Sequence, residues 1–256
     1  MKKIIVLKVG SAVLTNNENL ALDRLKNLVD FIALLKKDYN VILVSSGAVA
    51  SGYTLLKLDK KVIAKKQALA SIGQPLLMET YRKHFEVHNI ICSQVLLEAS
   101  LFKDSVRLKH AKDTINELLS NNVVPIINEN DVTAIEELVF GDNDQLSAHV
   151  TVHFGSELLV ILTDIDGYYD DNPHLNLNAK MQKNVLDIPS EALNARHTAN
   201  SEFATGGIVT KLKAADFLIK NNKQMFLTSG FDLNDARSFL LSNSHNKGTL
   251  FGNKDA

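Results

Sequence analysis

The chain has 256 residues, of which 45% are hydrophobic and 22% charged, proportions that are ordinary for a globular protein and exclude disordered, collagen-like and coiled-coil chains. Lysine and arginine number 28 against 29 aspartates and glutamates, a net charge of −1, so no global positive field attracts nucleic acid or an anionic membrane. No apolar run approaches the roughly 20 residues that span a bilayer, and we expect a cytoplasmic protein of one large domain or two small ones.

Short apolar segments alternate with amphipathic segments along the first two thirds of the chain, a pattern typical of parallel strands joined by helices. From residue 22 to residue 35, leucine, isoleucine and valine recur at helical spacing, which predicts a crossover helix. The segments VILV, VVPII and LLVIL are apolar throughout, so we expect strands buried on both faces of the sheet. The predicted fold class is therefore α/β, a three-layer αβα sandwich around a mainly parallel sheet, with strands at 4–9, 41–44, 90–95, 123–127, 158–163 and 224–228.

Four further features of the sequence bear on structure or metal binding. Residues 132–139 alternate less regularly between two polar clusters, and we interpret them as a hairpin or flap. Cys92, the single cysteine, lies in an apolar run, so a buried and inert thiol is expected. His149 and His153 are four residues apart but lack a third ligand, which favours packed or solvated histidines over zinc. The acidic residues 164–171 fail the EF-hand pattern at its glycine and glutamate positions.

Polar and glycine-rich clusters directly follow the predicted strands, where open α/β sheets bind their ligands. Two of them, Ser46-Gly47 and Gly206-Gly207, lead into predicted helices, whose N-terminal N–H groups and dipole favour an anion. Lys8 ends the first strand and Lys211 lies about one turn into a later helix, so both could point into one cleft. The chain lacks the P-loop motif and the G-x-G-x-x-G fingerprint. The pattern therefore indicates a phosphate site of another kind.

Six segments, in this order and at these spacings, resemble the glutamate 5-kinase branch of the amino acid kinase family: KVGSAVLT, VSSGAV, INENDVT, GDNDQLSA, TDIDGYY and ATGGIVTK. The resemblance extends to GTLF near the C-terminus, and NEND followed by GDND is its most specific part. It implies the amino acid kinase fold and ATP-dependent phosphorylation of the γ-carboxylate of L-glutamate to L-glutamyl 5-phosphate, the first step of proline biosynthesis. It also implies a single kinase domain over residues 1–256, without a C-terminal PUA domain, that forms a homodimer or homotetramer.

The resemblance also assigns roles to individual residues. Lys8 and Lys211 would neutralise the transferring phosphoryl group, and Asp144 would hold both lysines in position. Mg²⁺ is expected to arrive with ATP rather than in a metal site built from protein side chains. Glutamate would be bound by Ser46, Gly47, Asp131 and Asn143. ATP would be bound by Lys8, Gly10, Thr163, Asp164, Thr205, Gly206, Gly207, Ile208, Val209, Thr210 and Lys211, with Gly10 and Gly47 offering backbone amides and Asp142 as a supporting acid.

Two positions differ from the family pattern. Ala204 stands where glycine is usual and Ala12 where serine or threonine is common, and we expect altered geometry of the ATP loop at most.

Because the γ-carboxylate is already ionised at pH 7, the reaction needs no general base. Three alternatives remain: a kinase of the same fold acting on a related carboxylate such as N-acetylglutamate, an inactive nucleotide-binding protein, and an RNA-binding protein, which the balanced charge disfavours.

Overall fold

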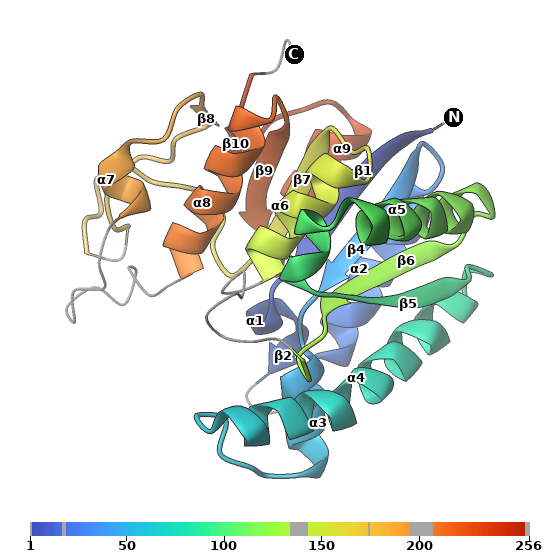
Figure 1. The fold of residues 1–256 in the computed structure, drawn as a ribbon. Coiled ribbons are helices and arrows are strands. Elements are labelled where there is room, and N and C mark those ends of the chain that lie inside the picture. The colour runs from blue at the N-terminus through green and yellow to red at the C-terminus, as the bar shows by residue number, and fades with distance from the viewer. Residues whose placement is uncertain (1, 17–18, 134–142, 174, 195–206, 254–256) are drawn as a thin grey trace.

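The computed structural model describes residues 2–16, 19–133, 143–173, 175–194 and 207–253. Within these ranges, an eight-stranded sheet carries helices on both of its faces (Figure 1). The predicted three-layer α/β class is therefore confirmed. Two short strands, β2 (Thr15–Asn16) and β3 (Asn19–Leu20), pair with each other apart from this sheet.

The sheet has the strand order β5-β6-β4-β1-β7-β9-β10-β8, and its neighbouring strands are parallel except for β9 and β10. All six predicted strands are present, each within two residues of its predicted ends. Strands β8 and β10 were not predicted, because two or three residues are too few for a periodic pattern. The strands are β1 (Lys3–Val9), β4 (Tyr39–Ser45), β5 (Cys92–Leu97), β6 (Val124–Glu129), β7 (Leu158–Thr163), β8 (Asn184–Val185), β9 (Gln224–Ser229) and β10 (Thr249–Phe251).

Two helical layers cover the sheet, each with its own apolar core. One layer contains α2 (Leu22–Leu35), α4 (Ile63–Glu86) and α9 (Asn234–Leu241). The other contains α5 (Ser105–Ser120), α6 (Asn143–His153) and α8 (Gly207–Lys220). The described residues also form the shorter helices α1 (Ser11–Leu14), α3 (Ala48–Leu55) and α7 (Ser190–Leu193), and the 3₁₀ helix η1 (Ala99–Lys103).

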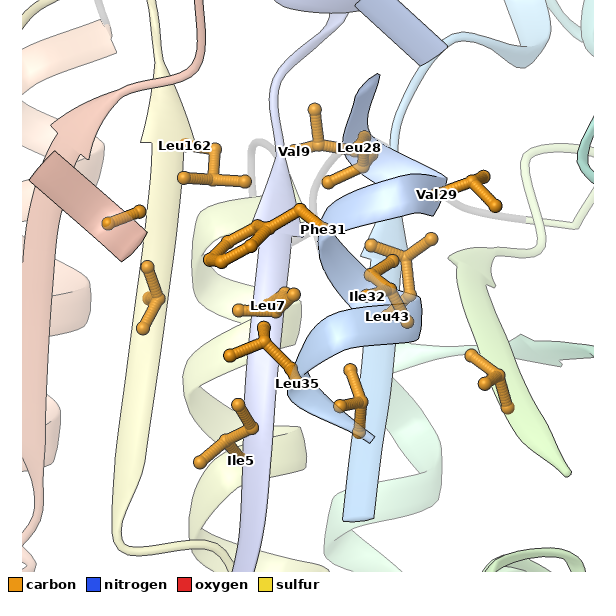
Figure 2. Packing of buried hydrophobic residues seen from close by; sticks show 14 of the residues in the cluster. Ile5, Leu7, Val9, Leu28, Val29, Phe31, Ile32, Leu35, Leu43 and Leu162 are labelled. Atoms are coloured by element: carbon orange, nitrogen blue, oxygen red, sulfur yellow. The ribbon is translucent and has the colours of Figure 1, made fainter. Parts of the chain in front are cut away.

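Helix α2 begins and ends at the residues that its apolar spacing predicts. Figure 2 shows Phe31, Ile32 and Leu35 of this helix lying over Leu7 of β1 and Leu43 of β4. Full burial of one such side chain contributes about 1.5–3 kcal/mol to stability. The apolar face of α2 therefore fixes the helix on the centre of the sheet through six buried residues, Leu25, Leu28, Val29, Phe31, Ile32 and Leu35.

Strand β1 occupies the centre of the sheet, between β4 and β7. Its alternate residues enter different cores, with Leu7 in the core under α2 and Val6 in the core under α6 and α8. From β1 the chain first builds the β4 side of the sheet and later the β7 side. Ligands of open α/β sheets bind at the carboxyl ends of the strands beside such a reversal, so this edge is where a site is expected.

Three of the remaining predictions fall on described residues. Cys92 is half-buried rather than buried, because it starts an edge strand, and burial raises the pKa of its thiol. His149 and His153 stack on each other with ring centroids 5.9 Å apart, so they are packed histidines, and burial lowers the pKa of His149 to about 4. None of the helices in the described ranges is both long and apolar enough to cross a membrane. Most of the predicted flap at 132–139 lies outside the described residues.

Candidate active site

Two lysines and one aspartate converge at the carboxyl edge of the sheet. The ammonium of Lys8, on β1, lies 2.5 Å from Oδ1 of Asp144, and the ammonium of Lys211, on α8, lies 3.1 Å from Oδ2. The hydroxyl of Thr210 also donates to Oδ2, at 3.1 Å. The structure therefore brings together the three residues for which the resemblance implies a catalytic role.

Burial gives this lysine cluster (Lys8, Asp144 and Lys211) its electrostatic character. The three side chains are 5%, 0% and 8% exposed, respectively. Two ammonium groups and one carboxylate carry a net charge of +1, and charges interact more strongly in a buried site than in water. Asp144 lies in the first turn of α6, where the positive end of the helix dipole stabilises a carboxylate. The arrangement is a preformed site for an anion.

At each ammonium group, the neighbouring glycine leaves room for about one methyl-sized group. A Cβ atom on Gly10 would lie 3.8 Å from Nζ of Lys8, and one on Gly207 would lie 3.9 Å from Nζ of Lys211. Gly10 has φ −75° and ψ 154°, a conformation that any residue adopts, and Gly207 is not among the described glycines with positive φ. The backbone therefore does not require glycine at these positions, and what glycine provides is room next to the charge.

The backbone amide of Gly10 is engaged within the protein, contrary to its predicted role. Its N–H donates to the carbonyl of Leu162 on β7, at 3.0 Å, and so helps to join the turn to the sheet. Ser11 and Ala12 follow in the first turn of α1, where a helix leaves N–H groups without intrahelical partners. Gly47 precedes α3 with φ 112°, a left-handed conformation that favours glycine.

A chain of side-chain amides links α6 to the opposite helical layer. Nδ2 of Asn143 donates to Oγ of Ser46 at 3.0 Å and to Oδ1 of Asn128 at 2.9 Å. Nδ2 of Asn128 donates to Oε1 of Gln74 at 3.0 Å, and Nε2 of Gln74 donates to Oε1 of Gln94 at 3.1 Å. Two predicted substrate residues are thus in direct contact. Neither glutamine was predicted, because an isolated polar residue in a helix or strand has no sequence signal.

Asp131 lies in the turn that follows β6, at the same edge of the sheet. Its carboxyl group is partly buried, and this burial raises its pKa, while the positive charge of Lys66 acts in the opposite direction. A partly buried carboxylate at this edge would attract a ligand cation such as an ammonium group.

The predicted ATP residues fall into two groups. Thr163 ends β7, and its hydroxyl donates to Oδ1 of the exposed Asp164 at 2.8 Å. Gly207, Ile208 and Val209 form the first turn of α8, together with Thr210 and Lys211. No three side chains able to ligate a metal converge within the described ranges. Thr205 and Gly206, as well as Asp142 and Ala204, lie outside the described residues.

Comparison with known proteins places the chain among kinases. Residues 3–229 match the model of the amino acid kinase family. The glutamate 5-kinase of Leishmania donovani is 53% identical over 249 residues, which cover 97% of this chain and 95% of the relative. The glutamate 5-kinase of Wolinella succinogenes is 54% identical over 252 residues, covering 96% of this chain and 97% of the relative.

Solved structures extend the similarity at the level of the fold. The isopentenyl phosphate kinase of T. acidophilum matches with a TM-score of 0.68 at 15% identity, covering 97% of this chain and 99% of that one. The UMP kinase of Ureaplasma parvum matches with a TM-score of 0.62 at 18% identity, covering 99% and 100% of the two chains. At this level of identity, these structures establish the shared fold alone.

Proposed function

The chain belongs to the amino acid kinase family, and we propose that it catalyses ATP-dependent phosphorylation of the γ-carboxylate of L-glutamate to L-glutamyl 5-phosphate, the first step of proline biosynthesis from glutamate. The observation that carries this proposal is the buried lysine cluster, with small residues at Gly10 and Gly207 beside its ammonium groups, in a chain that is 53% identical to a glutamate 5-kinase.

The chief obstacle to this reaction is charge repulsion. A carboxylate nucleophile must approach a polyanionic triphosphate, and two unit charges 4 Å apart repel by about 4 kcal/mol at an effective dielectric constant near 20. An ammonium group has three N–H donors, so its contact with Asp144 leaves donors for a ligand. Lys8 and Lys211 would offset the repulsion most strongly in the transition state, as negative charge spreads over the phosphoryl oxygens.

Asp144 acts as a positioning residue in this scheme. Each of its oxygens faces a different ammonium group, so one carboxylate fixes both cations on the two sides of the site. Without it, two buried cations would share a small volume with no counter-ion, which costs several kcal/mol. Asp144 therefore holds both lysines in place and balances part of their charge before a ligand arrives.

The substrate side of the cleft would be formed by the amide chain and Asp131. Asn143 donates to Oγ of Ser46, which leaves the hydroxyl hydrogen of Ser46 to donate to a substrate carboxylate. Asp131 would accept hydrogen bonds from the substrate ammonium group. Because the γ-carboxylate is ionised at neutral pH, the protein's own residues need only bind and orient it, and no proton has to be removed.

The proposal includes three further components. Mg²⁺ would accompany ATP and offset part of the charge of its phosphate oxygens. The kinase would operate in the cytoplasm, where ATP and glutamate are available, as one kinase domain whose ligand groups extend from Lys8 to Lys211. It would also assemble as a homo-oligomer, which is supported by exposed apolar residues near the edge strand β5, including Val87 and Ile91 at 77% and 69% exposure.

In the deciding experiment, the purified protein is incubated with ATP, Mg²⁺ and L-glutamate, and hydroxylamine is added to trap acyl phosphate. We expect glutamate-dependent release of ADP and formation of γ-glutamyl hydroxamate. Both should be lost in Lys8→Ala and retained in Lys109→Ala, which removes a 74% exposed ammonium group from α5.

Two results of the same assay would favour the alternatives. Faster turnover with N-acetylglutamate than with glutamate would indicate a kinase for the acetylated substrate. Binding of ATP with no turnover of either carboxylate would indicate an inactive nucleotide-binding protein, and the proposed function would be wrong.

A further inference from the structure

A hollow of about 300 Å³ lies between α2 and α9, beside Gly230 at the end of β9. It adjoins α1, the short helix that follows the Gly10 turn. A Cβ atom on Gly230 would come within 2.6 Å of the side chain of Val13 in α1, so the wall of the hollow is packed directly against that helix. None of the residues assigned to the proposed reaction lines it.

Two arginines give this hollow its chemical character. Arg24 of α2 and Arg237 of α9 both line it, and both are half-buried. Within the described part of the chain, neither guanidinium group forms an ion pair with a carboxylate. Guanidinium groups stay protonated in proteins, so the hollow contains two positive charges.

Contacts that do not neutralise the two guanidinium groups hold them in place. Arg24 donates to the carbonyls of Ala12 and Thr15, at 3.4 and 2.5 Å, and lies over the ring of Phe231, 5.0 Å from its centroid. Arg237 lies in the same way over Phe31, at 5.1 Å. Carbonyl dipoles and aromatic faces orient a cation without cancelling its charge.

The acid in the lining does not balance these charges. Oδ1 of Asp232 accepts a hydrogen bond from the backbone N–H of Asn234 at 2.9 Å. This carboxylate therefore binds the first residue of α9. With two guanidinium groups and one carboxylate, the lining of the hollow carries a net charge of +1. Asn27, one turn along α2 from Arg24, adds an exposed amide to the rim.

We propose that this hollow binds a small oxyanion, the carboxylate or phosphate group of a small metabolite. The planar fork of a guanidinium group matches both oxyanions through paired N–H donors. The volume of about 300 Å³ lies at the lower end of the range for ligand pockets, which suits a molecule of a few heavy atoms rather than a nucleotide.

Ligand binding in the hollow would alter the contacts that hold α1. A ligand that draws Arg24 away from the carbonyls of Ala12 and Thr15 breaks two of the hydrogen bonds that join α2 to this segment. The first turn of α1 directly follows Gly10, beside Lys8, so the oxyanion would change the kinetics of the lysine site. This coupling rests on the proposed function, whereas binding of the oxyanion does not.

Calorimetric titration of the whole protein with inorganic phosphate and, separately, with succinate tests the binding. Arg237→Gln removes one charge at similar side-chain length, and Asn27→Asp adds a repelling carboxylate at an exposed position. We expect each to weaken binding at the hollow by about tenfold or more, the scale of a lost charge-assisted hydrogen bond. Arg107→Gln, on the exposed surface of α5, is the matched control and should bind as the unmodified protein does. Thermal unfolding verifies that each variant is folded.

The outcomes distinguish the possible ligands. Binding of phosphate alone, or of succinate alone, that the two variants weaken identifies which oxyanion the hollow takes. Binding of neither probe, or equal binding by the unmodified protein and both variants, would overturn the proposal. Initial kinase rates measured against probe concentration then test the coupling. An inactive protein would contradict the proposed function but would not change the calorimetric evidence for binding.

Discussion

Lys8 and Lys211 meet at one carboxylate although they come from the first strand and from a late helix. Either ammonium group alone would balance the charge of Asp144. The second provides the net positive charge that attracts a phosphoryl group, and the burial of all three side chains keeps that charge effective. Three predictions concern the effect of single side chains on this site.

Removal of either lysine should impair turnover much more than substrate binding. In Lys8→Ala and in Lys211→Ala, Asp144 keeps one partner, so the fold should survive. Loss of a group that stabilises transition-state charge costs about 10²–10³ in kcat, and we expect this decrease with little change in the glutamate KM. Steady-state kinetics measure both quantities, and Lys220→Ala, exposed on the same helix as Lys211, is the control. A near-normal kcat in either variant would refute the assignment.

Gly10→Ala tests whether space beside Lys8 is required. The nearest atom to the new Cβ would be 3.7 Å away, an ordinary contact, and the backbone conformation suits alanine, so the melting temperature should not change. The methyl group would occupy the room next to the ammonium, and we expect kcat/KM for ATP to fall by about 10- to 100-fold. Ser11→Ala, the exposed neighbour, should remain active. Full activity of Gly10→Ala would show that no ligand atom uses this space.

Asp131 predicts a pH dependence of glutamate binding. Burial raises the pKa of its carboxyl group, so the group takes up a proton at a higher pH than an exposed aspartate does. As the pH falls through this raised pKa, the substrate ammonium group loses its partner and the glutamate KM should rise. In Asp131→Asn, we expect a KM about 5- to 150-fold higher at neutral pH and no such rise in acid.

The same substitution should not reduce stability at neutral pH. A carboxyl group whose pKa is raised in the folded state opposes folding once it ionises, and asparagine removes that cost. An unchanged or increased melting temperature together with a raised KM would support a binding role. A parallel loss of stability and of affinity would instead indicate a structural role for Asp131.

At the scale of elements, the start of α3 is held by direct contact between two helix backbones. A Cβ atom on Gly73 of α4 would lie 1.8 Å from the carbonyl oxygen of Ala48, and one on Gly52 of α3 would lie 1.9 Å from that of Leu69. The two helices cross so closely that no side chain fits between them. This contact places Ser46 and Gly47, which precede α3, beside the amide chain that includes Gln74.

Gly73→Ala should therefore force α3 and α4 apart. Overpacking of this kind costs about 1–3 kcal/mol of stability, and the displaced Ser46 and Gln74 should raise the glutamate KM. Chemical denaturation and kinetics measure the two effects. Ser71→Ala, on the exposed side of the same helical turn, is the control and should change neither. An unaltered free energy of unfolding in Gly73→Ala would contradict the close packing.

At the scale of the whole molecule, the sheet gathers residues from distant parts of the chain while one of its edges stays apolar. β5 forms that edge, and Val87, Ile91 and Leu96 near it are 77%, 69% and 39% exposed. An exposed edge strand is a pairing site, and the exposed apolar side chains near it favour an interface.

We expect a homo-oligomer in solution that uses this edge. Light scattering coupled to size-exclusion chromatography should give a mass of at least two chains, and Ile91→Lys should shift the protein towards the monomer. Leu177→Lys, which changes a 96% exposed residue in a loop, should leave the mass unaltered. A monomeric unmodified protein would contradict the prediction.

Sequence patterns were sufficient for the α/β class, the six long strands and helix α2, because burial imposes a period on every element long enough to display one. The pairing of Asn143 with Ser46 and the role of Gln74 could not be predicted. Such contacts depend on which elements become neighbours, and a single amide side chain leaves no periodic trace. The engagement of the Gly10 amide with Leu162 was missed for the same reason.

The sequence by itself determined the layers, the order of the motifs and the family, since each depends on residues close together in the chain or on a long match to known proteins. Only the tertiary structure decided that Lys8 and Lys211 share one carboxylate and that Gly10 and Gly207 leave space beside the two ammonium groups. It also decided that Arg24 and Arg237 line one hollow. The shared carboxylate and the hollow arise where strands and helices far apart in the sequence pack together, and such contacts are set by the whole core rather than by any local pattern.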